Sequence, residues 1–343
     1  MDKDLYLKKM KTAIAEAGYD NIYQDACICY AERLFNNNLP VIFDAVHFSR
    51  LLGVELDYLH KILFANECFY AQKSIPKRSG GYRLLEIPAL ELKSIQRWIL
   101  DNILKNISVS KFAMGFRDHK SIVDNAKVHL NKQCVINMDI KDFFPSVSFE
   151  QVFRIFYYFG YTKEVSFFLA RICTFKGHLP QGAPTSPYLS NIIALKLDAR
   201  LSALAKTYQA DYTRYADDLT FSGSAKMNKL VAIVHGIVAD EGFKINPNKT
   251  RIQYKSNRQE VTGVIVNGDK VKVNRKYKRE LGQQIYYCKM YGVNEHLKRI
   301  GCVKTFYKEH LYGKAYFIKS LYTANSFQMF IHPIHLAIIN LLS

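Results

Sequence analysis

The sequence predicts an α+β fold in which a split βαβ sheet lies between helical segments at both ends of the chain. Helical periodicity runs through residues 4–36 and 43–66, and a basic, largely helical segment follows residue 270. Between them the order is strand, helix, strand, strand, helix and a closing strand or hairpin, which suits such a sheet with helices on one face. With 343 residues, 49% of them hydrophobic, the chain can bury a substantial core.

The N-terminal part is predicted to be helical up to a β-hairpin. Residues 43–66 indicate two short helices joined near Gly53, a pattern more common in plain helical hairpins than in DNA-binding helix-turn-helix motifs. Residues 75–88, IPKRSGGYRLLEIP, predict a hairpin with a basic tip, because two β-prone runs flank Ser79-Gly80-Gly81. Residues 89–107 return to a helical pattern.

The middle third opens with residues 133–140, QCVINMDI, which predict a buried strand that ends on an acid. Ser186 as N-cap and Pro187 in the first turn predict a helix start. An apolar stripe follows at helical spacing, made of Leu189, Ile193, Leu197, Leu201 and Leu204.

Three further elements are expected before the C-terminal segment. Residues 228–240 are predicted to be helical, and FKINPNKT (243–250) to be strand and turn. EVTGVIVNGDKVKV (260–273) predicts a hairpin with Asn267-Gly268 at its turn.

The charge indicates a polyanionic partner. The formal net charge is +18, and residues 270–320 hold 13 Lys and Arg against 3 acidic residues, interleaved with Tyr and Phe. Cations hold phosphates and aromatic rings stack on bases, so nucleic acid is favoured over an acidic membrane surface or a merely solvated basic face. No long apolar run, signal peptide or paired cysteine motif is present, so we expect a cytoplasmic protein with reduced cysteines and no membrane partner.

Two adjacent acids, Asp217 and Asp218, stand between β-prone runs in RYADDLTFSG (214–223). A turn there can lie beside the end of the 133–140 strand, which would bring Asp139 to the same place. Three converging carboxylates are costly unless cations bind them, and hard oxygen ligands suit Mg²⁺. We therefore expect a site for two Mg²⁺ ions, with Asp139 and Asp217 as principal ligands and Asp218 as the auxiliary one, rather than a solvated turn.

Motifs around these carboxylates resemble those of reverse transcriptases. Tyr215-Ala216-Asp217-Asp218 matches their YxDD box, and MDIKDFFPSV (138–147) is similar to their first palm motif. LPQGAPTSPYLSN (179–191) is similar to the second and GFKINPNKT (242–250) to the fourth. Together with the hairpin, the motifs cover roughly residues 70–270 in the family's order. The resemblance implies a right-hand polymerase fold of fingers, palm and thumb, with the split βαβ sheet in the palm and a helical N-terminal extension.

Two further signatures resemble the bacterial retron reverse transcriptases. Residues 125–129, NAKVH, fit their N-A-x-x-H pattern, and Val261-Thr262-Gly263 fits their V-T-G. This resemblance implies an enzyme that binds a structured non-coding RNA of its own locus, primes from an RNA 2′-hydroxyl and makes branched msDNA from dNTPs. It also implies a part in anti-phage defence with an effector protein.

Site residues follow from the motif matches. The catalytic residues are expected to be Asp139, Asp217 and Asp218, with Ile140 joining them as a metal contact. Phe144 is expected to be the aromatic gate that excludes a 2′-hydroxyl, while Phe143 is core. The other expected nucleotide contacts are Gln181, Gly182, Lys77, Arg78 and Arg83, with Lys249 on the pyrophosphate side.

A last group of residues is expected to bind RNA or to serve structure. Asn125 and His129 are four apart and would share a helix face, where they would pin backbone or position RNA. The other members are Thr262, Gly263, Arg275, Lys276, Lys278, Arg279, Lys298 and Arg299.

The expected domains are a helical extension (1–70), fingers with part of the palm (71–138), the palm (139–265) and a basic helical thumb that binds RNA (266–343). About 80 residues after the V-T-G are too few for a thumb and an RNase H domain, so host RNase H would remove the template.

Rival functions stay open at this point. An RNA-dependent RNA polymerase would carry a G-D-D box and a smaller residue at Phe144. A reverse transcriptase of another bacterial class is a nearer rival. A non-enzymatic scaffold or antitoxin component that holds RNA, msDNA and an effector is the alternative of a different kind.

Overall fold

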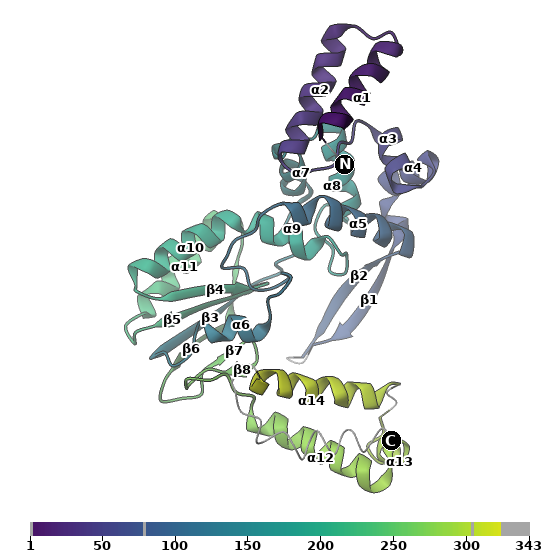
Figure 1. The fold of residues 1–343 in the computed structure, drawn as a ribbon. Helices are drawn as coiled ribbons and strands as arrows, with labels where there is room; N and C mark the ends of the chain where they lie inside the picture. Colours follow the sequence, from purple (N-terminus) through teal and green to yellow (C-terminus); the bar gives the residue numbers. More distant parts are fainter. Residues whose placement is uncertain (1–2, 78–79, 303–304, 324–343) are drawn as a thin grey trace.

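A computed structural model describes residues 3–77, 80–302 and 305–323 (Figure 1). The N-terminal part is helical, as predicted: α1 (Lys3–Glu16) and α2 (Asn21–Asn36) form a helical pair, followed by α3 (Ala45–Leu52) and α4 (Leu56–Phe64). Gly53 ends α3 in the left-handed conformation at φ 67°, so the turn expected near this glycine is confirmed. Figure 1 shows α1 and α2 extending away from the rest of the molecule.

The predicted hairpin is present and longer than expected. Strands β1 (Tyr70–Pro76) and β2 (Tyr82–Pro88) pair antiparallel along their whole length. Gly80 and Gly81 both have positive φ at the tip, a conformation that glycine adopts without a steric penalty. A short 3-10 turn (Asn66–Phe69) leads into β1. The hairpin is followed by α5 (Leu90–Asn102) and a second 3-10 turn (Leu104–Asn106).

The central sheet has the predicted split βαβ topology. Its strands are β3 (Cys134–Ile140), β4 (Asp211–Tyr215), β5 (Asp218–Gly223) and β6 (Ile245–Tyr254), in the spatial order β4-β5-β3-β6. All three neighbouring pairs are antiparallel. The end of β3 and the start of β5 therefore meet at one end of the sheet, where Asp139 pairs with Asp218.

One face of the sheet is covered by α10 (Leu195–Thr207) and α11 (Asn228–Asp240), which lie side by side in Figure 1. Apolar side chains of β3 and β5, such as Ile136 and Phe221, join the core on this face. The opposite face carries alternate residues, among them Asn137, Asp139 and Thr220. The helix α6 (Ile122–Lys127) contacts β4 and a later strand, β8 (Val264–Ile265).

Helices α7 (Phe149–Tyr158), α8 (Lys163–Cys173) and α9 (Ser186–Ile193) form a layer between the sheet and the N-terminal helices. The prediction of Ser186 as N-cap is wrong by one residue: Thr185 occupies the cap, and Ser186 is buried as the first helical residue. The predicted apolar stripe is divided between α9 and α10, because the chain leaves helical geometry at Ala194, with ψ 4°.

The predicted hairpin in residues 260–273 has its turn elsewhere. Strands β7 (Glu260–Val261) and β8 (Val264–Ile265) pair through a turn at Thr262-Gly263, not at Asn267-Gly268. Both turn residues have positive φ, as a type I′ hairpin turn requires. The residues around Asn267 instead form a wider loop, closed by paired backbone hydrogen bonds between Ile265 and Lys272.

The C-terminal helices are α12 (Arg275–Tyr291), α13 (Val293–Arg299) and α14 (Tyr307–Thr323). They share a second apolar core with α6, β7 and β8, to which Val123, Val261 and Leu281 belong. No helix among the described residues is long and apolar enough to cross a membrane. The proposed domain limits remain predictions, and the end of the 266–343 segment lies outside the described residues.

Candidate active site

The turn between β4 and β5 presents two carboxylates at the end of the sheet. Tyr215 and Asp218 are the last paired residues, so Ala216 and Asp217 form the whole turn, and Ala216 is left-handed at φ 57°. The backbone N–H of Ile140 donates to the carbonyl of Asp217 at 2.8 Å, which fastens the turn to the end of β3. Asp139 stands directly opposite Asp218 in register, and directly opposed residues lie on the same face. The predicted convergence of the three carboxylates is therefore present.

Burial and mutual repulsion both act against the ionised form of this carboxylate cluster. Burial raises the pKa of Asp217, and the charge of Asp139 raises it further. Burial also raises the pKa of Asp218 to about 6, with added repulsion from Asp217 and then Asp139. These directions show that carboxylates here are held against their preference for being solvated and apart, so a bound cation would stabilise the ionised cluster.

Lys249 supplies the one cation found in direct contact with Asp139 among the described residues. Its Nζ lies 2.8 Å from both carboxylate oxygens of Asp139. The register of β6 explains the contact: Asn246 lies opposite Asp139 and Arg251 opposite Asn137, so four residues of β6 correspond to one residue of β3. This bulge, which begins at Pro247, brings Lys249 back over the end of β3.

The residues present fit divalent cations in their chemistry. Carboxylate oxygens from Asp139, Asp217 and Asp218 are ligands that Mg²⁺ prefers, and Ile140 lies next to Asp139. In the described part of the chain, however, no group of three His, Cys, Asp or Glu side chains has the arrangement of a complete metal-binding site. Asp139 is engaged by Lys249, so a metal ion at this carboxylate would require the ammonium group to move.

The two phenylalanines after Asp139 differ in their surroundings, as expected. Phe143 is buried in the main core. Phe144 is half-buried, and its ring centroid lies 5.8 Å from that of Phe116, an exposed residue in a left-handed conformation. Phe144 thus keeps part of its ring surface accessible, which an aromatic gate needs.

Gln181 and Gly182 contact the β1–β2 hairpin. The N–H of Glu86 donates to the carbonyl of Gln181 at 3.0 Å, and the N–H of Gln181 donates to the Glu86 carboxylate at 3.3 Å. A Cβ on Gly182 would lie 2.5 Å from the carbonyl oxygen of Glu86, and its φ is 154°. The glycine is therefore needed for close approach between two backbones of the protein itself.

The hairpin carries cations on an exposed strand pair. Lys77 and Arg83 are exposed, and Arg78 lies outside the described residues. The charge of Arg83 lowers the pKa of Asp217, which places this guanidinium within electrostatic reach of the carboxylates. Of the hairpin residues, Arg83 is therefore the one whose charge acts on Asp217.

Asn125 and His129 are both fully buried, which favours the structural role over RNA contact. Helix α6 ends at Lys127, so His129 lies in the turn after it and not on a shared helix face. The imidazole of His129 is 2.7 Å from the hydroxyls of Ser222 and Thr213.

The two retron-like signatures meet in space. Asn125 Nδ2 donates to Thr262 Oγ1 at 3.4 Å, and Thr262 Oγ1 donates to the carbonyl of Ile122 at 3.3 Å. These bonds hold a threonine in the left-handed turn, and Gly263 follows it at φ 85°. The signatures therefore join α6 to the β7–β8 hairpin that leads into the C-terminal helices.

The predicted RNA-contacting cations lie on the C-terminal helices, Arg275, Lys276, Lys278 and Arg279 on α12 and Lys298 and Arg299 on α13. Lys276 is 3.8 Å from Glu280, and Arg299 is 3.5 Å from Glu295 and stacks over the Tyr291 ring at 3.9 Å. Arg275 and Arg279 are exposed one turn apart, so they present two positive charges on one side of α12.

Sequence reasoning missed a buried polar cluster under the turn. Arg214 on β4 is fully buried and pairs with Asp198 on α10, with Tyr212 and Asn191 beside it. The sequence signal for this cluster was weak: Arg214 stands in the β-prone run before the turn, and Asp198 directly follows Leu197 of the apolar stripe. A buried charge in each of two packed elements indicates a pair.

Comparisons with known proteins agree with this geometry. Residues 75–266 match the family model described as reverse transcriptase (RNA-dependent DNA polymerase). The chain is 35% identical over 293 residues to the retron Ec86 reverse transcriptase of Escherichia coli, covering 84% of this chain and 88% of the relative. It is 38% identical over 270 residues to the retron Mx162 reverse transcriptase of Myxococcus xanthus, covering 69% of this chain and 56% of the relative. Among solved structures, apo telomerase from Candida tropicalis aligns with a TM-score of 0.45 at 13% identity, covering 64% of this chain and 51% of that chain.

Proposed function

The chain belongs to the reverse transcriptases, and within them to the retron enzymes, and we propose that it copies a structured RNA of its own locus into branched msDNA. It is an RNA-directed DNA polymerase with a right-hand fold, in which β1 and β2 belong to the fingers, the four-stranded sheet to the palm and α12–α14 to the thumb. The proposal adds the primer, which is an RNA 2′-hydroxyl, and the branched product.

The observation that carries the proposal is the carboxylate cluster at the end of the sheet, with a lysine of β6 and an arginine of the β1–β2 hairpin acting on it. Asp139, Asp217 and Asp218, with Ile140, would hold two Mg²⁺ ions, which supply activation of the attacking hydroxyl and stabilisation of the leaving pyrophosphate. The charge of Arg83 acts on Asp217 from the fingers, and Lys249 contacts Asp139 from β6. Their positions support binding of the triphosphate by Arg83, with Lys77 and Arg78 on the same hairpin, and contact of Lys249 with the pyrophosphate side.

Phe144 supports the choice of dNTP over NTP. Its partly accessible ring follows Asp139 by five residues and lies against Phe116, so it can occupy the space that a 2′-hydroxyl would need. Gln181 would contact nucleotide or template, while Gly182 keeps the fingers and palm backbones in contact.

The thumb and the net charge of +18 support RNA and msDNA as partners. Its cations would recognise a duplex by backbone, shape and 2′-hydroxyl contacts. By its membership of the retron enzymes we further propose that it acts in anti-phage defence with an effector protein, and that host RNase H removes the copied template. A scaffold or antitoxin role can coexist with polymerisation.

The test uses nucleic acid that co-purifies with the protein expressed from its native locus. Denaturing gels with RNase, DNase and debranching enzyme compare the native chain, Asp217→Asn and a matched control, Asp211→Asn, at the other end of β4. We expect a branched, DNase-sensitive species attached to RNA in the native and control samples and none in Asp217→Asn. RNA alone in all three samples would contradict self-primed synthesis and favour the scaffold role.

A further inference from the structure

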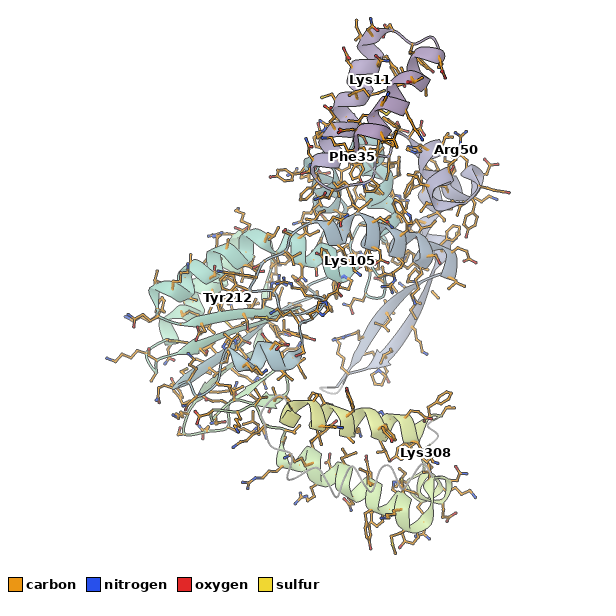
Figure 2. All side chains as sticks on the ribbon, viewed as in Figure 1. Lys11, Phe35, Arg50, Lys105, Tyr212 and Lys308 are labelled. Carbon is orange, nitrogen blue, oxygen red and sulfur yellow. The ribbon has the colours of Figure 1, made fainter. Side chains whose placement is uncertain are left out.

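Arg214 is a fully buried guanidinium whose bonds are all made inside the protein. Its Nε and Nη2 each donate at 2.8 Å to one carboxylate oxygen of Asp198 on α10, a residue that is also fully buried. The hydroxyl of Tyr212, labelled in Figure 2, donates at 2.8 Å to the same carboxylate. These contacts balance the charge of the pair.

The remaining nitrogen of the fork points toward the catalytic turn. Nη1 donates to Asn191 Oδ1 on α9 at 3.0 Å and to the carbonyl oxygen of Ala216 at 3.1 Å. Ala216 is the left-handed residue immediately before Asp217, and this conformation costs an L-residue about 1 kcal/mol or more. The guanidinium therefore holds the one residue of the turn whose conformation must be imposed.

The opposite side of Ala216 is also held. The N–H of Met114 donates to the Arg214 carbonyl at 2.7 Å, so residues 112–114 run alongside β4. Asn191 Nδ2 donates to the carbonyl of Gly115 at 3.0 Å, and a Cβ on Gly115 would lie 2.7 Å from the Ala216 nitrogen. The turn is thus enclosed between this segment and the guanidinium.

Arg214 also touches the other two palm motifs. Its guanidinium carbon lies 5.7 Å from the ring centroid of Phe143, the residue before the proposed gate. Asn191 ends the 179–191 segment that contains Gln181 and Gly182. One side chain therefore contacts residues of all three motifs.

Stability alone does not explain such a pair. Desolvating two charges is costly, and replacing a buried ion pair by apolar residues of similar volume is often neutral or stabilising. A bidentate, five-donor fork is instead suited to fixing several acceptors at once.

We infer that Arg214, Asp198 and Asn191 are positioning residues that set the Ala216-Asp217 turn and couple it to the nucleotide-side motif. Of these three side chains, Arg214 is the one that hydrogen-bonds to the backbone of the turn, at the Ala216 carbonyl. Asp198 orients the fork, and Asn191 transmits the position of α9. The inference rests on the proposed polymerase function of the same site.

Two variants separate positioning from charge balance. Arg214→Lys keeps a cation against Asp198 but lacks the planar fork that reaches Asn191 and Ala216 together. The triple variant Arg214→Met/Asp198→Leu/Tyr212→Phe removes the whole charged cluster without leaving an unpaired ion. The matched control is Gln96→Leu, a fully buried amide that makes two hydrogen bonds of 2.8 Å in α5, away from the turn.

The measurements are kcat and KM for dNTP per folded molecule, and Mn²⁺ affinity by electron paramagnetic resonance without substrate. We expect both Arg214 variants to lose about 10²-fold in kcat, the effect of a roughly 1 Å misplacement, with KM near native and weaker Mn²⁺ binding. Gln96→Leu should lose thermal stability but keep kcat and Mn²⁺ affinity.

Native kcat and Mn²⁺ affinity in whichever Arg214 variant folds would overturn the inference, as would an equal kcat loss in Gln96→Leu. If the native protein itself incorporates no dNTP, the proposed function fails, and Mn²⁺ affinity alone then decides whether Arg214 positions the carboxylates.

Discussion

At the scale of single residues, Lys249 occupies the place where a metal ion would meet Asp139. Its ammonium contacts both oxygens of that carboxylate, although half of the lysine side chain is exposed. The contact orients the Asp139 carboxylate. If a metal ion takes the place of the ammonium group, we expect Lys249 to become available to phosphate.

We therefore expect Lys249→Met to bind Mn²⁺ severalfold more tightly in the absence of dNTP, because a competing cation is gone, while its turnover falls. Electron paramagnetic resonance gives the affinity, and primer extension gives the turnover. Lys244→Met, at an exposed position on the same segment, is the control and should change neither. Unchanged Mn²⁺ affinity in Lys249→Met would show that the ion pair does not compete with metal.

The buried imidazole of His129 makes folding sensitive to pH. Burial lowers its pKa to about 3, from an ordinary value of 6.5. Between these values the unfolded chain binds a proton that the folded protein refuses, so this residue's contribution to stability is present above pH 6.5 and is lost as the pH falls toward 3. At pH 5 the loss is about 2 kcal/mol.

The corresponding prediction concerns a difference between two proteins. The raised pKa of Asp218, about 6, makes its contribution to the free energy of unfolding change in the opposite direction as the pH falls. This change is the same in the native protein and in His129→Gln, so it cancels in the difference between them. We expect the destabilisation caused by His129→Gln to shrink by about 2 kcal/mol between pH 8 and pH 5. Urea unfolding at both pH values measures it, and a pH-independent difference would contradict a neutral buried imidazole.

At the scale of elements, the joint between β2 and the 179–191 segment sets the distance between fingers and palm. Gly182 approaches the Glu86 carbonyl too closely for any side chain. Gly182→Ala must therefore move the hairpin, and with it Arg83, away from the carboxylates.

We expect Gly182→Ala to lower kcat/KM for dNTP by about 10²-fold, since misplacing a binding group by roughly 1 Å has that effect. Steady-state kinetics with a defined primer-template provides the measurement. Gly236→Ala is the matched control. Gly236 is exposed on α11 with free space where a Cβ would lie, so alanine should stabilise the helix by about 1 kcal/mol without altering kinetics. Native kinetics in Gly182→Ala would mean that the backbones at Gly182 and Glu86 can move apart without displacing Arg83.

Elements with a strong local signal were predictable from the sequence. Alternation and a bounded apolar run predict β3, and a two-residue turn between β-prone runs predicts the β4–β5 corner. The turn of the β7–β8 hairpin was misplaced because Asn267-Gly268 is the stronger local turn signal, whereas the left-handed Thr262 is held by α6 residues more than 130 positions earlier. Local rules do not contain that contact.

The sequence predicted which carboxylates meet at the candidate site but not which residues hold them in place; their role as metal ligands stays a prediction. The three carboxylates follow from spacing and like-charge cost, but the Lys249 contact depends on a register shift of β6 against β3. The Arg214 cluster likewise depends on how α9 and α10 pack on β4. Such contacts arise from tertiary packing, so the residues that hold a catalytic turn are harder to infer than those that perform chemistry.

At the scale of the whole molecule, positive charge is concentrated where α12 leaves the palm. Arg275 and Arg279 are exposed on one side of this helix, and the hairpin and C-terminal helices of Figure 1 approach the same end of the sheet. Phosphate contacts release counterions, so each one adds about 0.7–0.9 to the slope of log affinity against log salt. If each arginine contacts one phosphate of the RNA, Arg275→Gln/Arg279→Gln should lower that slope by about 1.4–1.8.

The control Lys8→Gln/Lys11→Gln removes the same charge from exposed positions on α1, where Figure 2 labels Lys11, and should leave the slope unchanged. Fluorescence anisotropy with the cognate RNA across a salt series gives both slopes. Equal reductions in the two variants would indicate that the net charge of +18 attracts RNA diffusely, without a thumb site.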